Sequence, residues 1–332
     1  MKHMAVASMT IAVVMLLMSV APALSGKTMV WPLQYDFYRS LCPKAEEGIR
    51  KTTWEIISQD PTMGAAFLKL FYEDCFNTYQ SSFGCDASLL LEPEKSANKM
   101  IRGSDAVNKI KTAVEAICPG VISCADIIAL AARDSTAISG GFSFPMPTGR
   151  RDALVSYPKD TFRTPDSYWT ANMTIPSFAR RGIDVDDLVV LSGAHSFGIA
   201  HCSSVDYRLI ELEETALRMN ASDADELNKL CPRAAPSGDI TDMGAAFNMN
   251  RVTDPNVLSN QFYSNVLIGR VLFVSDQTLM NLNETAAKVA LYAANPLTWM
   301  GRFATALVRL GVLQVLTGTQ GEVRKVCNAT NH

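Results

Sequence analysis

The chain has 332 residues, of which 48% are hydrophobic and 19% are charged, and its net charge is -3 at pH 7. This weakly acidic balance gives no electrostatic reason to expect nucleic acid or an anionic membrane surface as a partner. The length suits one large domain, or two lobes that share a site, behind an N-terminal leader.

Residues 1–25 have the layout of a secretory signal peptide. Lys2 and His3 precede an apolar stretch from Met9 to Val20, and small residues follow at the offsets expected for cleavage. The stretch is shorter than the roughly 18 residues of a membrane-spanning helix. We therefore expect the leader to be removed and residues 26–332 to form a single domain that is secreted to the extracellular space or cell wall.

Eight cysteines follow the leader. An even number in an oxidising compartment favours four disulfides over metal binding or free thiols, and spacing alone leaves about 105 connectivities open. Sequons for N-glycosylation support the secretory route and lie at Asn172, Asn220, Asn283 and Asn328. We expect a glycosylated monomer.

Most of the apolar periodicity is helical, which predicts a mainly α fold. In chain order, the predicted helices cover 47–58, 104–117, 124–138, 185–191, 284–294 and 297–310. Ser123 and Asn283 are expected N-caps, and Gly311 is an expected helix stop. Short strands are expected at most near 143–150, and loops are expected over 157–168 and 233–253.

His195 is the strongest candidate site residue, because it follows an apolar helical run and glycines lie beside it. A histidine in such a place is more often a packed core residue than a ligand. However, Asp276 follows the apolar run 271–274 and could accept a hydrogen bond from Nδ1 of His195, which makes Nε2 a better metal donor. For His201, simple packing is the favoured interpretation.

The chain resembles the secretory plant haem peroxidases, usually called class III. The motifs that carry this resemblance are Lys69-Leu-Phe-Tyr-Glu73-Asp74-Cys75, Gly84-Cys85-Asp86-Ala-Ser88, Cys118-Pro-Gly-Val-Ile-Ser-Cys124-Ala-Asp126, Gly149-Arg-Arg-Asp152, Leu191-Ser-Gly-Ala-His195 and Ser275-Asp276-Gln277. They occur in the family's order and span the mature chain.

The resemblance implies a two-lobed, mainly α haem peroxidase fold with haem b between a distal and a proximal helical lobe. His195 would be the iron ligand and Asp276 its hydrogen-bond partner. The family's disulfide pattern would pair Cys42–Cys118, Cys75–Cys85, Cys124–Cys327 and Cys202–Cys231.

The family also binds two calcium ions through oxygen ligands. Asp74, Asp86 and Ser88, with the carbonyl of Gly84, match the distal calcium site. The second site is matched at Ser196 and Asp254, but Arg251 replaces a carboxylate. We expect an Arg251–Asp254 ion pair there in place of the second ion.

The distal side departs from the family pattern. The family cleaves peroxide with a histidine that moves a proton and an arginine that stabilises the developing charge. Here Glu73 stands at the histidine and Lys69 at the arginine. In addition, Thr164-Pro165-Asp166-Ser167 replaces the family's Leu-Pro-x-Pro segment beside the aromatic donor.

Two functions therefore remain open. The first is an extracellular peroxidase that reduces hydrogen peroxide and oxidises small phenolic donors slowly. The second is a degenerate haem-binding or structural protein of the extracellular matrix. A serine hydrolase is excluded because the Gly-x-Ser-x-Gly spacing is missed by one residue, and cysteine-bound zinc is disfavoured because the cysteine spacings are too wide.

Overall fold

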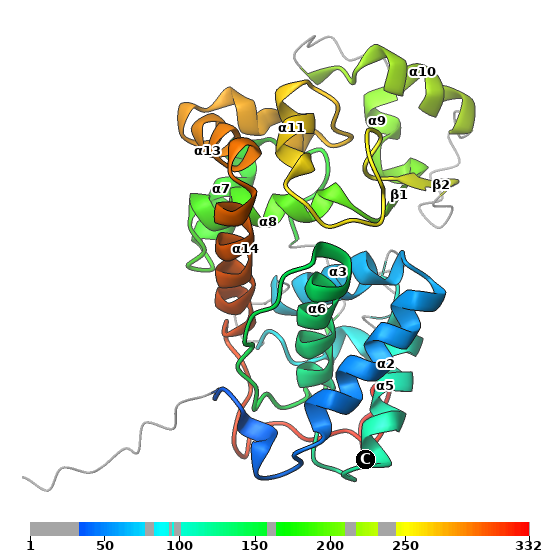
Figure 1. The fold of residues 1–332 in the computed structure, drawn as a ribbon, viewed down its shortest axis with the longest axis vertical. Coiled ribbons are helices and arrows are strands. Elements are labelled where there is room, and N and C mark those ends of the chain that lie inside the picture. Colours follow the sequence, from blue (N-terminus) through cyan, green and yellow to red (C-terminus); the bar gives the residue numbers. More distant parts are fainter. Residues whose placement is uncertain are drawn as a thin grey trace, which may run out of the picture. The chain divides into compact units, whose positions relative to one another are not determined.

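The computed structural model describes residues 33–76, 83–92, 95, 101–157, 164–209, 217–231 and 244–331. The expected leader, residues 1–25, lies outside the described residues. Within them the chain is mainly helical, as the sequence predicted, and the strands are short (Figure 1).

The first group of helices consists of α2 (Ala45–Gln59), α3 (Met63–Phe76), α5 (Ser104–Glu115) and α6 (Cys124–Gly140). Helix α6 packs against α2 and α3, and α2 also packs against α5. Their apolar faces meet in a core that includes Phe67, Phe71, Ile127 and Leu130. Helix α6 is almost entirely buried through Thr136, and its N-cap is Ser123, as predicted, because the Ser123 hydroxyl accepts from the backbone N–H of Asp126.

The second group begins after residue 164 and contains most of the shorter helices. Their bounds are α7 Ala171–Ala179, α8 Val185–Ser192, α9 Asp206–Leu209, α10 Ala221–Leu230, α11 Gln261–Leu267, α12 Val274–Gln277, α13 Asn283–Ala294 and α14 Pro296–Gly311. Helix α8 packs against α7, α13 and α14. Helix α14 also contacts α3, so it connects the two groups (Figure 1).

One sheet is present in the described part of the chain, and the sequence did not predict it. Strand β1 (Ile199–His201) pairs antiparallel with β2 (Ala246–Asn248), with Ala200 opposite Phe247. Strand β2 falls inside the region expected to be a loop. The strand expected near 143–150 is reduced to isolated bridges at Thr148 and Arg150. The expected N-cap at Asn283 is also wrong, because Asn283 is the first helical residue and caps nothing with its side chain.

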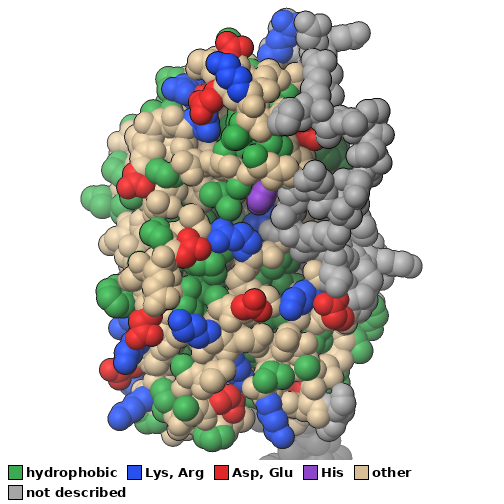
Figure 2. Space-filling model, turned by 90° about the vertical axis from the view of Figure 1, so that its right-hand side faces the viewer, with side chains coloured by type: hydrophobic (Ala, Val, Ile, Leu, Met, Phe, Trp, Pro, Cys, Tyr) green, Lys and Arg blue, Asp and Glu red, His purple; other side chains and the backbone are tan. Residues whose placement is uncertain are grey.

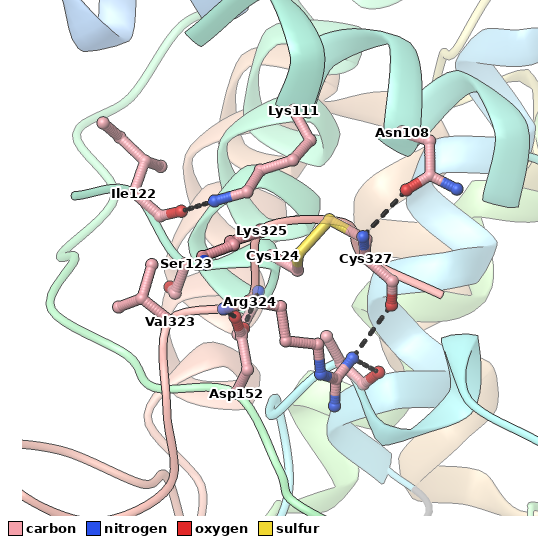
Figure 3. Close-up of a disulfide and its surroundings, with 12 residues drawn as sticks. Asn108, Lys111, Ile122, Ser123, Cys124, Asp152, Val323, Arg324, Lys325 and Cys327 are labelled. Carbon is pink, nitrogen blue, oxygen red and sulfur yellow. Dashed lines mark hydrogen bonds between the residues drawn. A yellow bond between two sulfur atoms is a disulfide. The ribbon is translucent and has the colours of Figure 1, made fainter. Parts of the chain in front are cut away.

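All four disulfides that the resemblance implied are present: Cys42–Cys118, Cys75–Cys85, Cys124–Cys327 and Cys202–Cys231. The third ties the first residue of α6 to the C-terminal segment, 203 residues further along the chain (Figure 3). The Arg324 guanidinium donates to the carbonyls of Cys327 at 3.0 Å and Ala153 at 2.7 Å, and its backbone N–H donates to Asp152 at 2.9 Å. The C-terminal segment is therefore fixed by polar contacts as well as by the disulfide.

The Gly149-Arg-Arg-Asp152 motif has a structural role. Arg150 forms a fully buried ion pair with Asp126, with 2.8 Å between Nη1 and Oδ1. The other carboxylate oxygen of Asp126 accepts from the Tyr38 hydroxyl and from the Gly149 N–H, each at 2.7 Å. Buried charges are tolerated only when they are paired and hydrogen-bonded, and here the carboxylate is satisfied on both oxygens.

Candidate functional site

Helix α8 delivers His195, and its sequence explains where it starts and ends. The Asp184 carboxylate accepts from the backbone N–H of Asp187 at 2.8 Å, which caps the N-terminus. At the other end, the Tyr263 hydroxyl donates to the Val189 carbonyl at 2.9 Å, and the Trp299 indole donates to that of Val190 at 3.3 Å. These partners satisfy carbonyls that the end of the helix would leave unpaired. A short 3-10 turn, Gly193–Ser196, then carries His195.

Two glycines beside His195 allow this tight packing. A Cβ on Gly193 would lie 2.6 Å from the Trp299 indole nitrogen. Gly198 has a φ of +93°, and a Cβ there would lie 2.5 Å from the Cβ of Ala65 on α3. A larger residue at either position would push apart elements that hold the histidine in place.

The structure brings His195 and Asp276 together, as the sequence predicted. The Nδ1 atom of His195 lies 2.8 Å from Oδ1 of Asp276, whose side chain is 3% exposed, while that of His195 is 38% exposed. The rings of Phe273 and Phe262 stand edge-on to the imidazole, with centroids at 5.3 and 6.0 Å. The Asp276 carboxylate can accept a hydrogen bond from Nδ1–H of His195, and in that tautomer the imidazole lone pair is on Nε2.

Lys69 and Glu73 lie one helical turn apart on α3 and form an ion pair. The distance between Lys69 Nζ and Glu73 Oε1 is 3.6 Å, and the two side chains are 45% and 10% exposed. The Thr164 hydroxyl donates to the second oxygen of Glu73, Oε2, at 3.0 Å. Each carboxylate oxygen of Glu73 therefore has its own partner. In the sequence, Thr164 stands out only as part of the segment that replaces Leu-Pro-x-Pro, and no local pattern predicts its contact with Glu73.

Among the residues matched to the distal calcium site, Gly84, Asp86 and Ser88 lie in one short segment, and Asp74 lies near the end of α3. Asp74 and Asp86 are both buried, and they accept from the backbone N–H groups of Ala87 and Ser88, each at 3.0 Å. The Cys75–Cys85 disulfide closes the loop that carries Gly84. Burial raises the pKa of Asp86 to about 6, against the opposing effect of its hydrogen bonds with Ser88.

The residues matched to the second calcium site are arranged differently from our expectation. Arg251 pairs with Glu226 of α10, so the predicted Arg251–Asp254 pair is wrong. Asp254 instead accepts from the Asn256 N–H at 2.8 Å, and the Ser196 hydroxyl accepts from the Ser259 N–H at 2.9 Å. Side-chain oxygens of Ser196 and Asp254 are thus engaged by backbone donors within the protein.

Among the described residues, no group of three or more His, Cys, Asp or Glu side chains forms a metal-binding cluster. None of the described helices combines the length and apolar character needed to cross a bilayer.

His201 lies on β1, where its Nδ1 atom is 3.4 Å from the Gly244 carbonyl. On the face in Figure 2, a histidine side chain (purple) reaches the surface beside a lysine or arginine side chain (blue).

The fold and the His195–Asp276 pair define a helical protein in which a buried carboxylate orients one partly exposed imidazole. Comparisons with known proteins agree. A family model described as peroxidase matches residues 49–295 of this chain. Peroxidase 2 of Zea mays is 40% identical over 333 residues, which cover 95% of this chain and 94% of that protein.

Further relatives give the same result. Peroxidase 12 of Arabidopsis thaliana is 35% identical, over 90% of this chain and 83% of its own length. Peroxidase P7 of Brassica rapa subsp. rapa is 37% identical, over 90% of this chain and 100% of its own length. The chain belongs to the peroxidase family, which confirms the resemblance seen in its motifs.

Membership of this family implies haem, and the residues around His195 fit that group. The buried Asp276 carboxylate orients the imidazole of His195. The His195 side chain is partly exposed, although most of the preceding helix α8 is buried. No described residue forms a hydrogen bond with Nε2, the atom that would bind iron. Two phenyl rings beside the imidazole supply the apolar surroundings that a porphyrin needs.

Proposed function

We propose that this protein is an extracellular haem peroxidase that reduces hydrogen peroxide slowly and oxidises small phenolic or aromatic donors. Membership of the peroxidase family supports the reaction class. The 2.8 Å contact between His195 and Asp276 is the observation that carries the proposal, because it suits an iron ligand better than a packed core histidine. Bound haem would supply the iron at which peroxide is reduced and from which donors are oxidised.

On the proximal side, Asp276 accepts a hydrogen bond from Nδ1–H of His195 and thereby fixes the plane of the ring. This leaves Nε2 as an electron-rich donor toward iron, since a hydrogen bond to a carboxylate raises the basicity of a ligating histidine. His195 is therefore the haem ligand in this proposal, and Asp276 is the residue that positions it.

On the distal side, we assign proton transfer to Glu73 and charge stabilisation to Lys69. The Glu73 carboxylate can accept a proton from bound peroxide and return it to the departing oxygen. Lysine offers a point charge without the planar fork of arginine, so it stabilises the peroxide oxygens less well. In addition, Lys69 is already paired with Glu73 at 3.6 Å, which favours slow turnover.

The proposal includes one structural calcium ion. Asp74 at the end of α3 would hold it together with Asp86, Ser88 and the Gly84 carbonyl, beside the Cys75–Cys85 disulfide. For the second site, at Ser196 and Asp254, we propose no bound ion, because Arg251 stands where the family has a carboxylate and pairs with Glu226. The leader over residues 1–25 and N-glycosylation of a monomeric domain complete the proposal of a secreted or cell-wall protein.

The Lys69–Glu73 ion pair also favours a second candidate function, a haem-binding extracellular protein without useful turnover. Steady-state oxidation of guaiacol by the haem-loaded protein separates the two. We expect the wild type to oxidise guaiacol in a peroxide-dependent reaction. The Glu73→Gln variant should lose this oxidation but keep the haem spectrum of the wild type. Haem binding with no oxidation above free haem, in the wild type and the variant alike, would support the second function.

A further inference from the structure

Arg208 is a buried cation in the second helical group. It lies on α9 and is 4% exposed, and no ion pair of Arg208 is present within the described part of the chain. Burial lowers the pKa of Arg208, against the opposing influence of the nearby Tyr207 and Asp276. A buried charge is tolerated only when its polar atoms are satisfied. The donors of Arg208 therefore need acceptors in their surroundings.

Five hydrogen bonds satisfy the guanidinium, and all of them go to carbonyl oxygens. Its Nη1 atom donates to the backbone carbonyls of Val271 at 2.9 Å and Leu272 at 2.8 Å. Its Nη2 atom donates to the side-chain carbonyl of Gln277. Both Nε and Nη2 donate to the carbonyl of Leu217, at 3.2 and 3.0 Å. The planar fork thus joins the chain before α10 to the segment 271–277.

The segment 271–277 carries two side chains that contact His195. Asp276 lies 2.8 Å from Nδ1 of the imidazole, and the ring of Phe273 stands edge-on to it, with centroids 5.3 Å apart. Arg208 holds this segment on both sides of these residues, at the two carbonyls directly before Phe273 and at the side chain directly after Asp276. A displacement of the segment would therefore move the partner of Nδ1.

Helix α12, within this segment, cannot fix its own position. It has only four residues, and a single helical turn has too few internal hydrogen bonds to be stable alone. Contacts from elsewhere must hold it. The Val274 N–H donates to the Tyr207 hydroxyl at 3.4 Å, and the Ser275 N–H donates to the Ser167 carbonyl at 3.1 Å. Arg208 adds the charged contacts, which are stronger than those between neutral groups.

We propose that Arg208 is a positioning residue for the His195–Asp276 pair. Its guanidinium clamps the segment 271–277, so that Asp276 keeps its contact with Nδ1 and Nε2 stays a strong donor toward haem iron. The inference rests on the proposed function, in which His195 binds that iron. A residue with a structural role alone would change the stability of the fold but leave the donor strength of Nε2 as it is.

Arg208→Lys tests this role, because it keeps the positive charge and removes the planar fork. We expect Asp276 to move away from Nδ1, which makes the imidazole a weaker donor. In resonance Raman spectra of the reduced, haem-loaded protein, the iron–histidine stretching band should shift part of the way toward its position in Asp276→Asn. Transfer of haem to apo-globin should become about tenfold faster, the lower end of the range for loss of such a partner.

Arg150→Lys is the matched control. Arg150 is also buried, its Nε and Nη2 atoms also share one carbonyl, that of Gly311, and its Nη1 atom donates to the carbonyl of Pro147. Arg150 contacts neither His195 nor the segment 271–277. The same replacement there should lower the midpoint of urea unfolding, but it should leave the Raman band and the haem transfer rate as in the wild type.

Gln277→Met is a milder variant, since it removes one acceptor of Arg208 and keeps the guanidinium. It should shift the Raman band in the same direction by a smaller amount, and it takes the place of Arg208→Lys if that variant does not fold. The proposal is overturned if the variant used keeps the band and the haem transfer rate of the wild type. It is also overturned if Arg150→Lys shifts the band as far.

Failure of the proposed function would give a different result, namely a purified wild type without haem. Arg208 is then tested through the ¹⁵N chemical shifts of His195 in that protein, labelled at histidine and assigned with His195→Ala. We expect the Nδ1-protonated tautomer in the wild type and a mixture of both tautomers in Arg208→Lys. Equal shifts in the two proteins would overturn the positioning role of Arg208.

Discussion

The hydroxyl of Thr164 donates a hydrogen bond to Oε2 of Glu73, with 3.0 Å between the oxygens, across 91 residues of sequence. Together with Lys69 on Oε1, it fixes the orientation of the distal carboxylate. A group that moves a proton must be held toward its target. Thr164 is therefore a positioning residue in the proposed reaction.

Replacing Thr164 by valine keeps the shape of the side chain and removes the hydroxyl. A hydrogen bond to a charged group contributes about 1.5–3 kcal/mol, and its loss lets the Glu73 carboxylate rotate. We expect the rate of peroxide consumption, measured by stopped-flow absorbance of the haem-loaded protein, to fall by about tenfold. Thr164→Ser should keep most of the rate. Equal rates for valine and serine would remove Thr164 from this role.

Combined Glu73→His and Lys69→Arg replacement should accelerate the reaction with peroxide by orders of magnitude. The exchange restores both the proton-transfer group and the planar cation, and each effect is typically worth about a hundredfold or more. The rate constant for peroxide consumption gives the measurement. Lys69→Arg alone is the matched control and should give a much smaller gain. An unchanged rate in the double variant would mean that the distal assignment is wrong.

Asp276→Asn should loosen the haem without unfolding the protein. The asparagine cannot supply the charge that strengthens Nε2 of His195, and loss of such a partner typically weakens metal binding by 10- to 100-fold. Transfer of haem to an apo-globin acceptor should be faster by about that factor. Asp206→Asn, at an exposed position, serves as the control. Equal transfer rates for the two variants would show that Asp276 does not support the ligand.

Asp126→Asn should strongly destabilise the fold. It leaves the Arg150 guanidinium buried without its counter-charge, and breaking a buried pair in this way costs about 3–5 kcal/mol. The free energy of unfolding from urea titration measures the effect. The exposed Arg39–Asp36 pair offers the comparison, and Asp36→Asn should change little. A similar small loss for Asp126→Asn would show that the buried pair is not needed.

The stability of the calcium-free protein should depend on pH through Asp86. Its pKa is raised to about 6 in the folded state because the carboxyl group is buried, whereas an unfolded aspartate titrates near 4. The folded state therefore holds this proton more tightly, so stability falls as pH rises from about 4 to about 6, by up to about 3 kcal/mol.

Urea unfolding in a chelator measures this pH dependence. The Asp86→Asn variant cannot titrate at this position and should lack that part of the slope. Added calcium should reduce the slope as well, since it binds the ionised carboxylate. A slope that is the same in the variant and the wild type would assign the pH dependence to other groups.

The helices could be predicted from sequence because their information is local. Periodic apolar residues defined α5 and α6 within a few residues, and Ser123 was recognisable as an N-cap from its type and position alone. The disulfide partners were a different matter. Spacing left them open, and the family resemblance supplied all four pairs.

Pairings between distant residues were largely invisible in the sequence. Strands β1 and β2 have three residues each, too few for an alternating pattern to show. Thr164 carries no local mark that it faces Glu73. Arg251 was matched to the nearby Asp254, but the fold brings Glu226 of α10 closer. His195 and Asp276 were paired correctly because both belong to family motifs.

The most direct test of the account is the visible absorption spectrum of the purified secreted protein, recorded before and after one equivalent of hydrogen peroxide and compared with His195→Ala. We predict a haem band that His195→Ala loses or shifts, and that changes slowly on addition of peroxide. A wild-type protein without a haem band, or a band that His195→Ala leaves unchanged, would contradict the assignment of His195 as the haem ligand.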